Sequence, residues 1–223
     1  MKVGVMGASG YVGGELLRLI INHPEVELSF ATSRQYDGKF LYKIHPNLKE
    51  FTDVKFSLFD SSKVADQCDF LFTAVPHGTS YEFMNELVNS GVKIVDMSAD
   101  YRLSNPVMYD KWYGFTHPLP NLLDLFTFGL PEIHKDSIKS SKFTSTPGCT
   151  ALTSILALAP LIHDKIINSN NIIIDSKVGS SGAGVKPTLG SHHANRYGVI
   201  PVSYTHLRAH ETRHDLVCRL LLE

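Results

Sequence analysis

Several features that mark particular classes of protein are scarce or missing in this sequence. The 223 residues include three cysteines, which form no Cys-x-x-Cys pair. There is no run of about 18 apolar residues, as a membrane-spanning helix needs, and no secretory signal pattern at the N-terminus. The formal net charge of −1, with lysines and acidic residues interleaved, excludes the basic stripe typical of nucleic-acid binding. These absences predict a cytoplasmic protein with reduced thiols and without a membrane or nucleic-acid partner.

Arginine is also scarce until the end of the chain, where the composition changes abruptly. Residues 1–202 contain 14 lysines and four arginines, whereas residues 203–223 contain three arginines, three histidines and no lysine. We therefore expect residues 203–223 to be a non-native tail, which fold reasoning should leave out. The alternative is a short amphipathic helix whose apolar stripe is Leu216, Val217, Leu220 and Leu221.

What the sequence does contain is an alternation of strand-like and helix-like segments. Strands are predicted for the Val/Ile/Phe-rich runs at 2–7, 26–33, 69–76, 93–100, 142–146 and 171–178. Helical patterns lie between them, at 11–23 and 80–91, and residues 101–135 predict irregular structure with a short helix. This rhythm is typical of an α/β protein with a Rossmann-type parallel sheet. We expect a nucleotide-binding domain over 1–148 and the beginning of a second α/β or α+β domain over 149–202.

A glycine-rich loop follows the first predicted strand and precedes the first predicted helix. Residues 7–13 read GASGYVG, in the context that the dinucleotide fingerprint requires. Gly7 allows the tight turn, Gly10 lets the backbone approach a pyrophosphate, and Gly13 permits close helix packing. The expected cofactor contacts in this loop are Gly7, Ser9, Gly10, Tyr11, Val12 and Gly13. The alternative is a glycine-rich turn that binds nothing.

The end of the second predicted strand indicates which dinucleotide is bound. An NAD enzyme usually has an acidic residue there for the ribose 2′-hydroxyl, whereas this chain has Ser33, Arg34 and Gln35. Arginine forms forked, charge-assisted bonds to phosphate, so these residues favour NADP, with a solvated surface arginine as the alternative. Pro76 and His77, in TAVPHGTS, are expected to line the cofactor side, and His77 is interpreted as a loop residue rather than a base.

Cys149 is the candidate nucleophile. It lies in STPGCTALTSILALAPLI, where Thr146 can cap a helix, Pro147 suits the first helical position and Cys149 falls in the first turn. Free amides and the helix dipole favour the thiolate form there and can also receive an oxyanion. This position, behind a nicotinamide domain, predicts thioester chemistry followed by hydride transfer. Cys68 is expected to be a buried small hydrophobe.

Two further clusters fit the same chemistry. Ser98 and Arg102, in DMSADYRL, follow a predicted strand and are candidates for holding a substrate phosphate or carboxylate. Ser180 and Gly182, in GSSGAG, offer amides and a hydroxyl to the cofactor, although a plain flexible loop is the alternative. Adjacent histidines in GSHHANR would point to different sides of a regular element, so no metal site is expected.

Taken together, the motifs GASGYVGGELLRL, TAVPHGTS, DMSADYRL, FGLPE, STPGC and SKVGSSGAG resemble the N-acetyl-γ-glutamyl-phosphate reductase family over residues 1–202. The segments TSRQYDG, HPNL and GSHHANR resemble the branch that reduces aminoadipyl or glutamyl phosphate while a small acidic carrier protein holds the substrate's amino group. The resemblance implies NADPH, a two-domain subunit that forms homo-oligomers, Cys149 as nucleophile, and a place in arginine or lysine biosynthesis.

The resemblance also implies a longer protein. Family members are about half as long again, and their catalytic histidine lies beyond the point where the resemblance ends, so no catalytic histidine is assigned here. Three rival interpretations stay open. Aspartate-semialdehyde dehydrogenase shares the chemistry but usually has Asn where this chain has Thr150. A cysteine acyl-hydrolase would need neither Arg34 nor the glycine loop, and the third alternative is a dinucleotide-binding fragment without catalysis.

Overall fold

The computed structural model describes residues 1–168, 172–174 and 176–196. Within these residues, seven strands form one parallel sheet in the order β3-β2-β1-β4-β5-β7-β6. The strands are β1 (Lys2–Met6), β2 (Glu27–Thr32), β3 (Phe56–Ser57), β4 (Phe70–Thr73), β5 (Lys93–Asp96), β6 (Phe126–Phe128) and β7 (Phe143–Ser145). The sheet confirms the predicted Rossmann-type fold, because the strand order reverses beside β1 as in dinucleotide-binding sheets.

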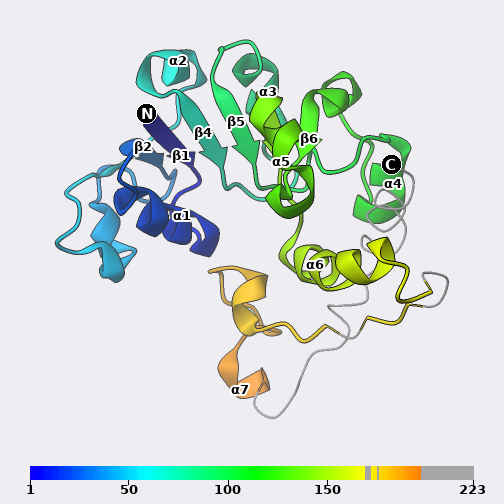
Figure 1. Cartoon of the computed structure of the whole chain (residues 1–223). Coiled ribbons are helices and arrows are strands. Elements are labelled where there is room, and N and C mark those ends of the chain that lie inside the picture. The colour runs from blue at the N-terminus through cyan, green and yellow to red at the C-terminus, as the bar shows by residue number, and fades with distance from the viewer. Residues whose placement is uncertain (169–171, 175, 197–223) are drawn as a thin grey trace. The chain divides into compact units, whose positions relative to one another are not determined.

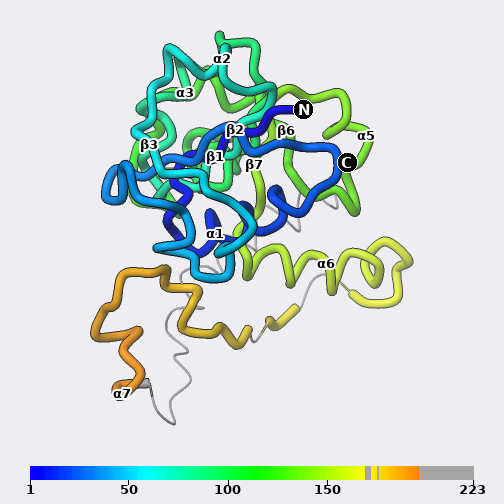
Figure 2. The backbone as a smooth tube through the Cα atoms, turned by 90° about the vertical axis from the view of Figure 1, so that its left-hand side faces the viewer, coloured from blue at the N-terminus to red at the C-terminus, as the bar shows by residue number. Residues whose placement is uncertain are grey.

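Helices connect the strands. They are α1 (Tyr11–Ile21), α2 (Val64–Gln67), α3 (Tyr81–Leu87), α4 (Val107–Tyr113), α5 (Pro131–Ser140), α6 (Cys149–His163) and α7 (His193–Arg196). Short 3-10 helices lie at Leu41–Lys43, Pro46–Leu48, Ser61–Lys63, Pro120–Leu125 and Ser180–Ala183. Figures 1 and 2 show α1 on one face of the sheet and α2 and α3 on the other. No helix of the described residues has both the length and the apolar character needed to cross a membrane.

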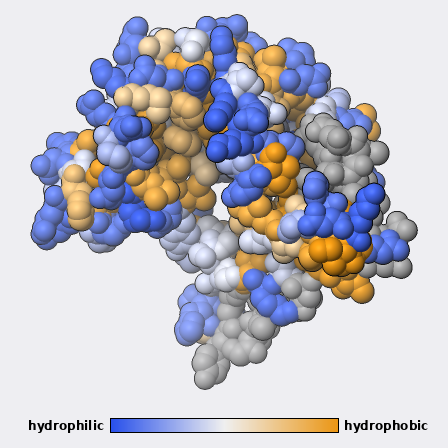
Figure 3. Space-filling model, viewed as in Figure 1, coloured by the Kyte–Doolittle hydropathy of each residue, from blue (hydrophilic) through white to orange (hydrophobic). Residues whose placement is uncertain are grey.

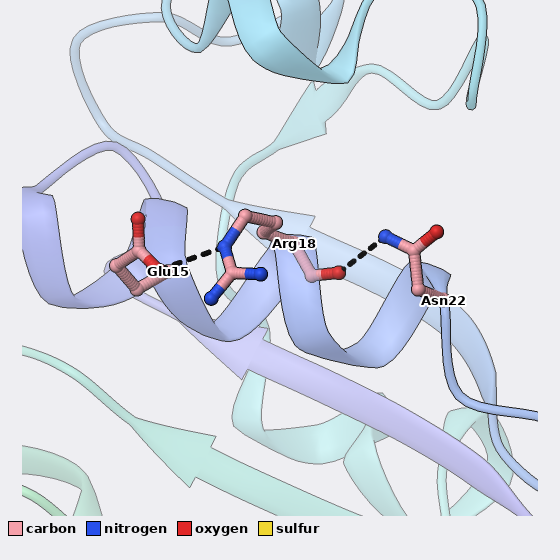
Figure 4. A network of polar contacts seen from close by, with 3 residues as sticks. All are labelled: Glu15, Arg18 and Asn22. Atoms are coloured by element: carbon pink, nitrogen blue, oxygen red, sulfur yellow. Dashed lines mark hydrogen bonds and ion pairs between the residues drawn. The ribbon is translucent and has the colours of Figure 1, made fainter.

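Helix α1 is the element that carries the glycine loop against the sheet. Its apolar side chains recur at helical spacing, and Leu17 and Ile20 pack with Val3 and Val5 of β1 in one buried cluster. The helix ends one residue before Asn22, whose side-chain amide donates to the carbonyl oxygen of Arg18 at 2.7 Å (Figure 4). The core under α1 is therefore apolar. The Asn22 side chain satisfies one of the carbonyl groups at the C-terminal end of α1.

The chain divides into two compact units. Unit 1 comprises residues 1–106 and 117–146, and the described part of unit 2 comprises residues 107–116, 147–168, 172–174 and 176–196. Unit 1 contains the whole sheet. Unit 2 contains α4, α6 and α7, and apolar side chains gather over α6 (Figure 3). The expected boundary between residues 148 and 149 stays a prediction.

Some expectations about regular structure were wrong. Residues 172–174 and 176–178 are not in a strand, and Ile173 is 96% exposed. A strand requires a pairing neighbour, and no ladder includes these residues in the part of the chain that the structure describes. The stretch 101–135 is also more regular than expected, because it contains β6 and the start of α5 as well as a short helix.

Candidate active site

The glycine loop is tied to the end of the neighbouring strand. Gly7 has a φ of 78°, and the amides of Gly7 and Ala8 donate to Thr32 at the end of β2, to its hydroxyl at 3.3 Å and its carbonyl at 2.9 Å. The left-handed φ strains any residue with a side chain, and a Cβ here would lie 2.4 Å from the Ala74 carbonyl oxygen. The turn therefore needs glycine at position 7 for reasons internal to the fold.

Gly13 and Gly10 serve different purposes. A Cβ on Gly13 would lie 2.6 Å from the Cα of Ala8, so glycine lets α1 pack against the loop. A Cβ on Gly10 would meet nothing closer than the Gly7 carbonyl oxygen at 4.0 Å, and Gly10 has an ordinary φ of −80°. The fold does not require glycine at position 10. The open space above Gly10 fits a phosphate that approaches the backbone closely, as a dinucleotide does.

The start of α1 can receive an anion. Gly10 is the N-cap, no side chain caps it, and the first-turn amides that follow include those of Tyr11 and Val12. The side chains of both residues are about half exposed, at 52% and 51%. Free amides and the positive end of the helix dipole together favour a pyrophosphate at this position.

The structure brings the second predicted cofactor segment to the glycine loop. The buried Ser33 hydroxyl donates to the Ser9 hydroxyl at 3.0 Å. The next residues, Arg34 and Gln35, are exposed. The Arg34 Nη2 lies 3.4 Å from Glu82 Oε2 of α3, and its guanidinium lies over the Phe83 ring at 5.9 Å. The hydrogen bond between Ser33 and Ser9 thus joins the end of β2 to the glycine loop.

A second loop, after β4, is held by the segment after β5. The Asp100 carboxylate accepts from the Gly78 amide at 2.7 Å and from the Ser80 amide and hydroxyl at 3.0 and 2.8 Å. The Ala99 amide donates to His77 Nδ1 at 2.8 Å. His77 and its neighbour Pro76 are exposed. These bonds fix the conformation in which Pro76 is presented, whereas its contact with a cofactor stays a prediction.

The predicted substrate residue Ser98 is fully buried. Its hydroxyl donates to Asp96 Oδ2 at 2.6 Å, accepts from the Asp100 amide at 3.0 Å and lies 3.1 Å from the Ser80 hydroxyl. Through its hydroxyl, Ser98 therefore links the loop after β4 to the loop after β5. Direct contact of Ser98 with a substrate stays a prediction.

Asp96 is a buried carboxylate in the same network, and sequence reasoning did not single it out. It is fully buried, and burial raises the pKa of its carboxyl to about 6, although hydrogen bonds from Ser98 and Thr73 act in the opposite direction. The Thr73 hydroxyl donates to it at 2.5 Å. An acidic residue at the end of a strand-like run was the available signal, but composition alone does not distinguish it from an exposed aspartate.

His117 completes this buried network. Its Nε2 donates to the Asp100 carbonyl oxygen at 2.6 Å, and its Nδ1 accepts from the Leu119 amide at 3.2 Å. This pattern requires the neutral ring, and burial lowers the pKa of His117. His117 therefore has a structural role, because its neutral ring joins two backbone segments of unit 1.

Arg102 holds the segment between β7 and Cys149 through backbone hydrogen bonds. Its Nε donates to the Thr146 carbonyl oxygen at 2.8 Å and its Nη2 to the Met97 carbonyl oxygen at 3.0 Å. The Thr146 amide also donates to the Asp96 carbonyl oxygen at 2.9 Å. Thr146 precedes Cys149 by three residues, so Arg102 fixes the backbone just before the thiol. Binding of a substrate anion by Arg102 stays a prediction.

Cys149 is the first residue of α6, and it is exposed. The N-cap is Gly148 rather than Thr146, and no side chain caps it, so the expected Thr146 cap was wrong. The helix begins two residues later because Thr146 is held by the sheet and Arg102. Cys149 nevertheless lies in the first turn, as predicted. Cys68, in contrast, is buried, and burial raises the pKa of its thiol to about 11.

The remaining predicted cofactor residues lie in unit 2. Ser180 and Gly182 belong to the 3-10 helix Ser180–Ala183, which ends at Gly184 with a φ of 85°. Ser180 is exposed, as a ligand-binding residue or a plain loop residue would be. Their contact with a cofactor stays a prediction. The expected tail, residues 203–223, lies outside the described residues.

Two family profiles match the chain. The semialdehyde dehydrogenase NAD-binding domain matches residues 2–141, which is more than half of the chain. The chain belongs to the semialdehyde dehydrogenase family. The dimerisation domain of the same family matches residues 149–216, so this match continues past Val202 into the expected tail, whose origin stays a prediction.

Several curated proteins are similar to this semialdehyde dehydrogenase family member. The LysW-L-2-aminoadipate/LysW-L-glutamate phosphate reductase of Saccharolobus solfataricus is 46% identical over 200 residues, 90% of this chain and 57% of the relative. A Nitrosopumilus maritimus protein, provisionally given the same name, is 56% identical with the same coverage. N-acetyl-gamma-glutamyl-phosphate reductase of Methanopyrus kandleri is 45% identical over 86% of this chain and 56% of the relative. These names confirm the resemblance, and the chain spans little more than half the length of each relative.

Solved structures of the family share the fold. Aspartate semialdehyde dehydrogenase from Candida albicans, solved with NADP, superposes with a TM-score of 0.51 at 18% identity, covering 73% of this chain and 47% of that one. The Vibrio cholerae enzyme II gives a TM-score of 0.50 at 20% identity, covering 73% and 46%. At this identity the likeness shows the architecture alone.

Proposed function

We propose that the protein is an NADPH-dependent reductase that converts an acyl phosphate to the semialdehyde through a thioester on Cys149. The observation that carries the proposal is the exposed thiol at the first residue of α6, in a chain that also has an NAD-binding domain. Amides at a helix start favour the thiolate and stabilise negative charge on an attacked carbonyl oxygen.

The proposed reaction consumes one hydride and one proton for each acyl phosphate that is reduced. The Cys149 thiolate attacks the acyl carbon, the bond from that carbon to the phosphate oxygen breaks, and the leaving group takes up the proton and departs as hydrogen phosphate. When bound, NADPH supplies a hydride to the thioester carbon. The carbon–sulfur bond then breaks, which releases the aldehyde and restores the thiolate. Ser98 and Arg102 are proposed to hold the substrate, directly or through the backbone that they fix.

The substrate proposed is aminoadipyl or glutamyl phosphate whose amino group is held by a carrier protein. The support is the name shared by the relatives from Saccharolobus solfataricus and Nitrosopumilus maritimus. The acetylated glutamyl phosphate is the second candidate, because the Methanopyrus kandleri relative carries that name at nearly the same identity. Either substrate places the reaction in lysine or arginine biosynthesis. A homo-oligomer is proposed from the dimerisation-domain match, and a cytoplasmic setting from the need for a reduced thiol.

The cofactor preference gives a direct test. We expect NADPH to bind about tenfold more tightly than NADH, and Arg34→Asp to remove the difference, a change of about 1.4 kcal/mol. The reason is the exposed guanidinium at the end of β2, beside the Ser9–Ser33 contact. Titration of the chain with each cofactor measures both affinities. Equal affinities in the unmodified chain would refute the NADPH preference.

A further inference from the structure

The Arg34 guanidinium has an ionic partner inside the protein. Its Nη2 lies 3.4 Å from Glu82 Oε2, and both side chains are well exposed, at 75% and 53%. The guanidinium also lies over the ring of Phe83, which packs edge-on against Phe59 at 5.2 Å. A single long contact between exposed groups is weak, so Glu82 can be displaced from Arg34.

Both partners stand on backbone that is fixed by other contacts. The Ser33 amide donates to the Ser57 carbonyl oxygen at 3.0 Å, directly before Arg34. Glu82 is the second residue of α3, and the Asp100 carboxylate holds the residues just before that helix through the Gly78 and Ser80 amides. The fixed backbone on both sides therefore keeps the Glu82 carboxylate close to the Arg34 guanidinium.

We propose that Glu82 is a specificity-determining residue, which competes with the 2′-phosphate of NADPH for Arg34 and so limits the preference for NADPH over NADH. This inference rests on the proposed function, because it takes Arg34 as the 2′-phosphate site. A phosphate monoester carries a charge of about −1.5 to −2 at neutral pH, so a carboxylate beside it opposes its binding. NADH has no phosphate at this position and is insensitive to Glu82.

The test compares Glu82→Gln with a matched control, Glu15→Gln. Glu15 forms a second exposed glutamate–arginine pair among the described residues, with Arg18 at 2.8 Å (Figure 4). Dissociation constants of NADPH and NADH are measured on the 223-residue chain at low and high salt. We expect Glu82→Gln to tighten NADPH binding about two- to fivefold at low salt, less at high salt, and to leave NADH binding unchanged. Glu15→Gln should change neither.

A double variant separates this inference from the proposed function. In an Arg34→Gln background, Glu82→Gln should no longer tighten NADPH binding, because the two residues act through one contact. If Glu82→Gln leaves NADPH binding equal or weaker while Arg34→Gln removes the cofactor preference, the role of Glu82 is wrong and the proposed function stands. If the unmodified chain and Glu82→Gln each bind both cofactors equally, the NADPH preference and the role of Glu82 are both wrong. Equal tightening by Glu15→Gln would overturn the role of Glu82 as well.

Discussion

The two units of the molecule differ in the pairing of their buried polar groups and in the exposure of their apolar side chains. In unit 1, buried polar groups such as Asp96, Ser98 and Asp100 are paired with one another, and apolar residues of α1 and β1 share one core. In the described part of unit 2, large apolar side chains lie in solvent, including Ile173 at 96% and Leu189 at 86% exposure. The proposed cofactor loop therefore lies in the unit with the buried polar network, and the proposed nucleophile Cys149 lies in the unit that holds the most exposed of the large apolar side chains. The two functions can be tested separately.

The sharpest test of that separation is Cys149→Ser. We expect acyl-phosphate reduction to fall about a thousandfold or more, roughly 4 kcal/mol, because serine is a far weaker nucleophile, with NADPH affinity unchanged. The measurement is acyl-phosphate-dependent oxidation of NADPH, in protein carrying the further residues that its relatives have. Cys68→Ala, at the buried thiol, is the control and should keep activity. Near-normal turnover of the serine variant would contradict the assignment.

The buried network of unit 1 can be tested through pH. The pKa of Asp96 is raised from 3.8 to about 6 in the folded protein, so the folded state binds more protons than the unfolded state between these values. Stability from this group is present below pH 3.8 and is lost as pH rises through about 6, by about 3 kcal/mol. Asp96→Asn should remove this loss, measured as the difference in unfolding free energy between variant and unmodified chain from pH 4 to 7.

Asp60→Asn is the control for that measurement. Lys63 and Ser62 lower the pKa of this exposed carboxyl, so its stability contribution has the opposite pH dependence, lost as pH falls. A difference between Asp96→Asn and the unmodified chain that stays constant with pH would contradict the raised pKa of Asp96.

Substitutions at two glycines of the loop can test folding and cofactor binding separately within unit 1. Gly13→Ala should cost about 1–3 kcal/mol of unfolding free energy, because its Cβ would overlap Ala8. Gly10→Ala has open space, so it should leave stability unchanged and weaken NADPH binding about tenfold or more, as the methyl group occupies the approach to the backbone. Denaturant titration and cofactor titration of both variants check this. Loss of stability in Gly10→Ala would show that the fold, not a ligand, requires that glycine.

The smallest effect is expected on the exposed surface of unit 2. Leu189→Ser should change the unfolding free energy by less than about 0.5 kcal/mol, since the side chain is 86% exposed. Leu17→Ala, in the core of unit 1, should cost about 2–5 kcal/mol. Denaturant titrations of both variants test the difference between the units. A large cost for Leu189→Ser would mean that this part of unit 2 is covered in solution.

The sequence predicted the elements whose signals are local. The apolar runs around β1, β2, β4 and β5 identified those strands, and the glycine spacing identified the start of α1. The short strands β3 and β6 were not predicted, whereas β7, which also has three residues, was predicted from the run at 142–146. The run at 171–178 has strand composition, but a strand also needs a neighbour, which composition does not supply.

The candidate site shows the same limit. Cys149 and Arg34 could be proposed from the sequence, because their residue types and positions indicate a chemistry. Asp96 and Glu82 were not singled out, because their contacts are with residues that are distant in sequence, Thr73 and Arg34. Burial and pairing across elements decide whether an acidic residue is a surface charge or part of a site, and neither can be read from one segment.

The central position of β1 has a consequence for how the protein is made. One side of β1 pairs with β2, and the other pairs with β4, where Val3 lies opposite Phe70. At about 5–20 residues per second of synthesis, the ribosome delivers that second partner roughly 3–13 s after β1. During this time the backbone amides and carbonyl groups of β1 on that side have no native partner, and the strand that carries them is apolar. A nascent chain stalled before residue 70 should therefore bind chaperones that recognise apolar strands, and one stalled after β5 should be released from them.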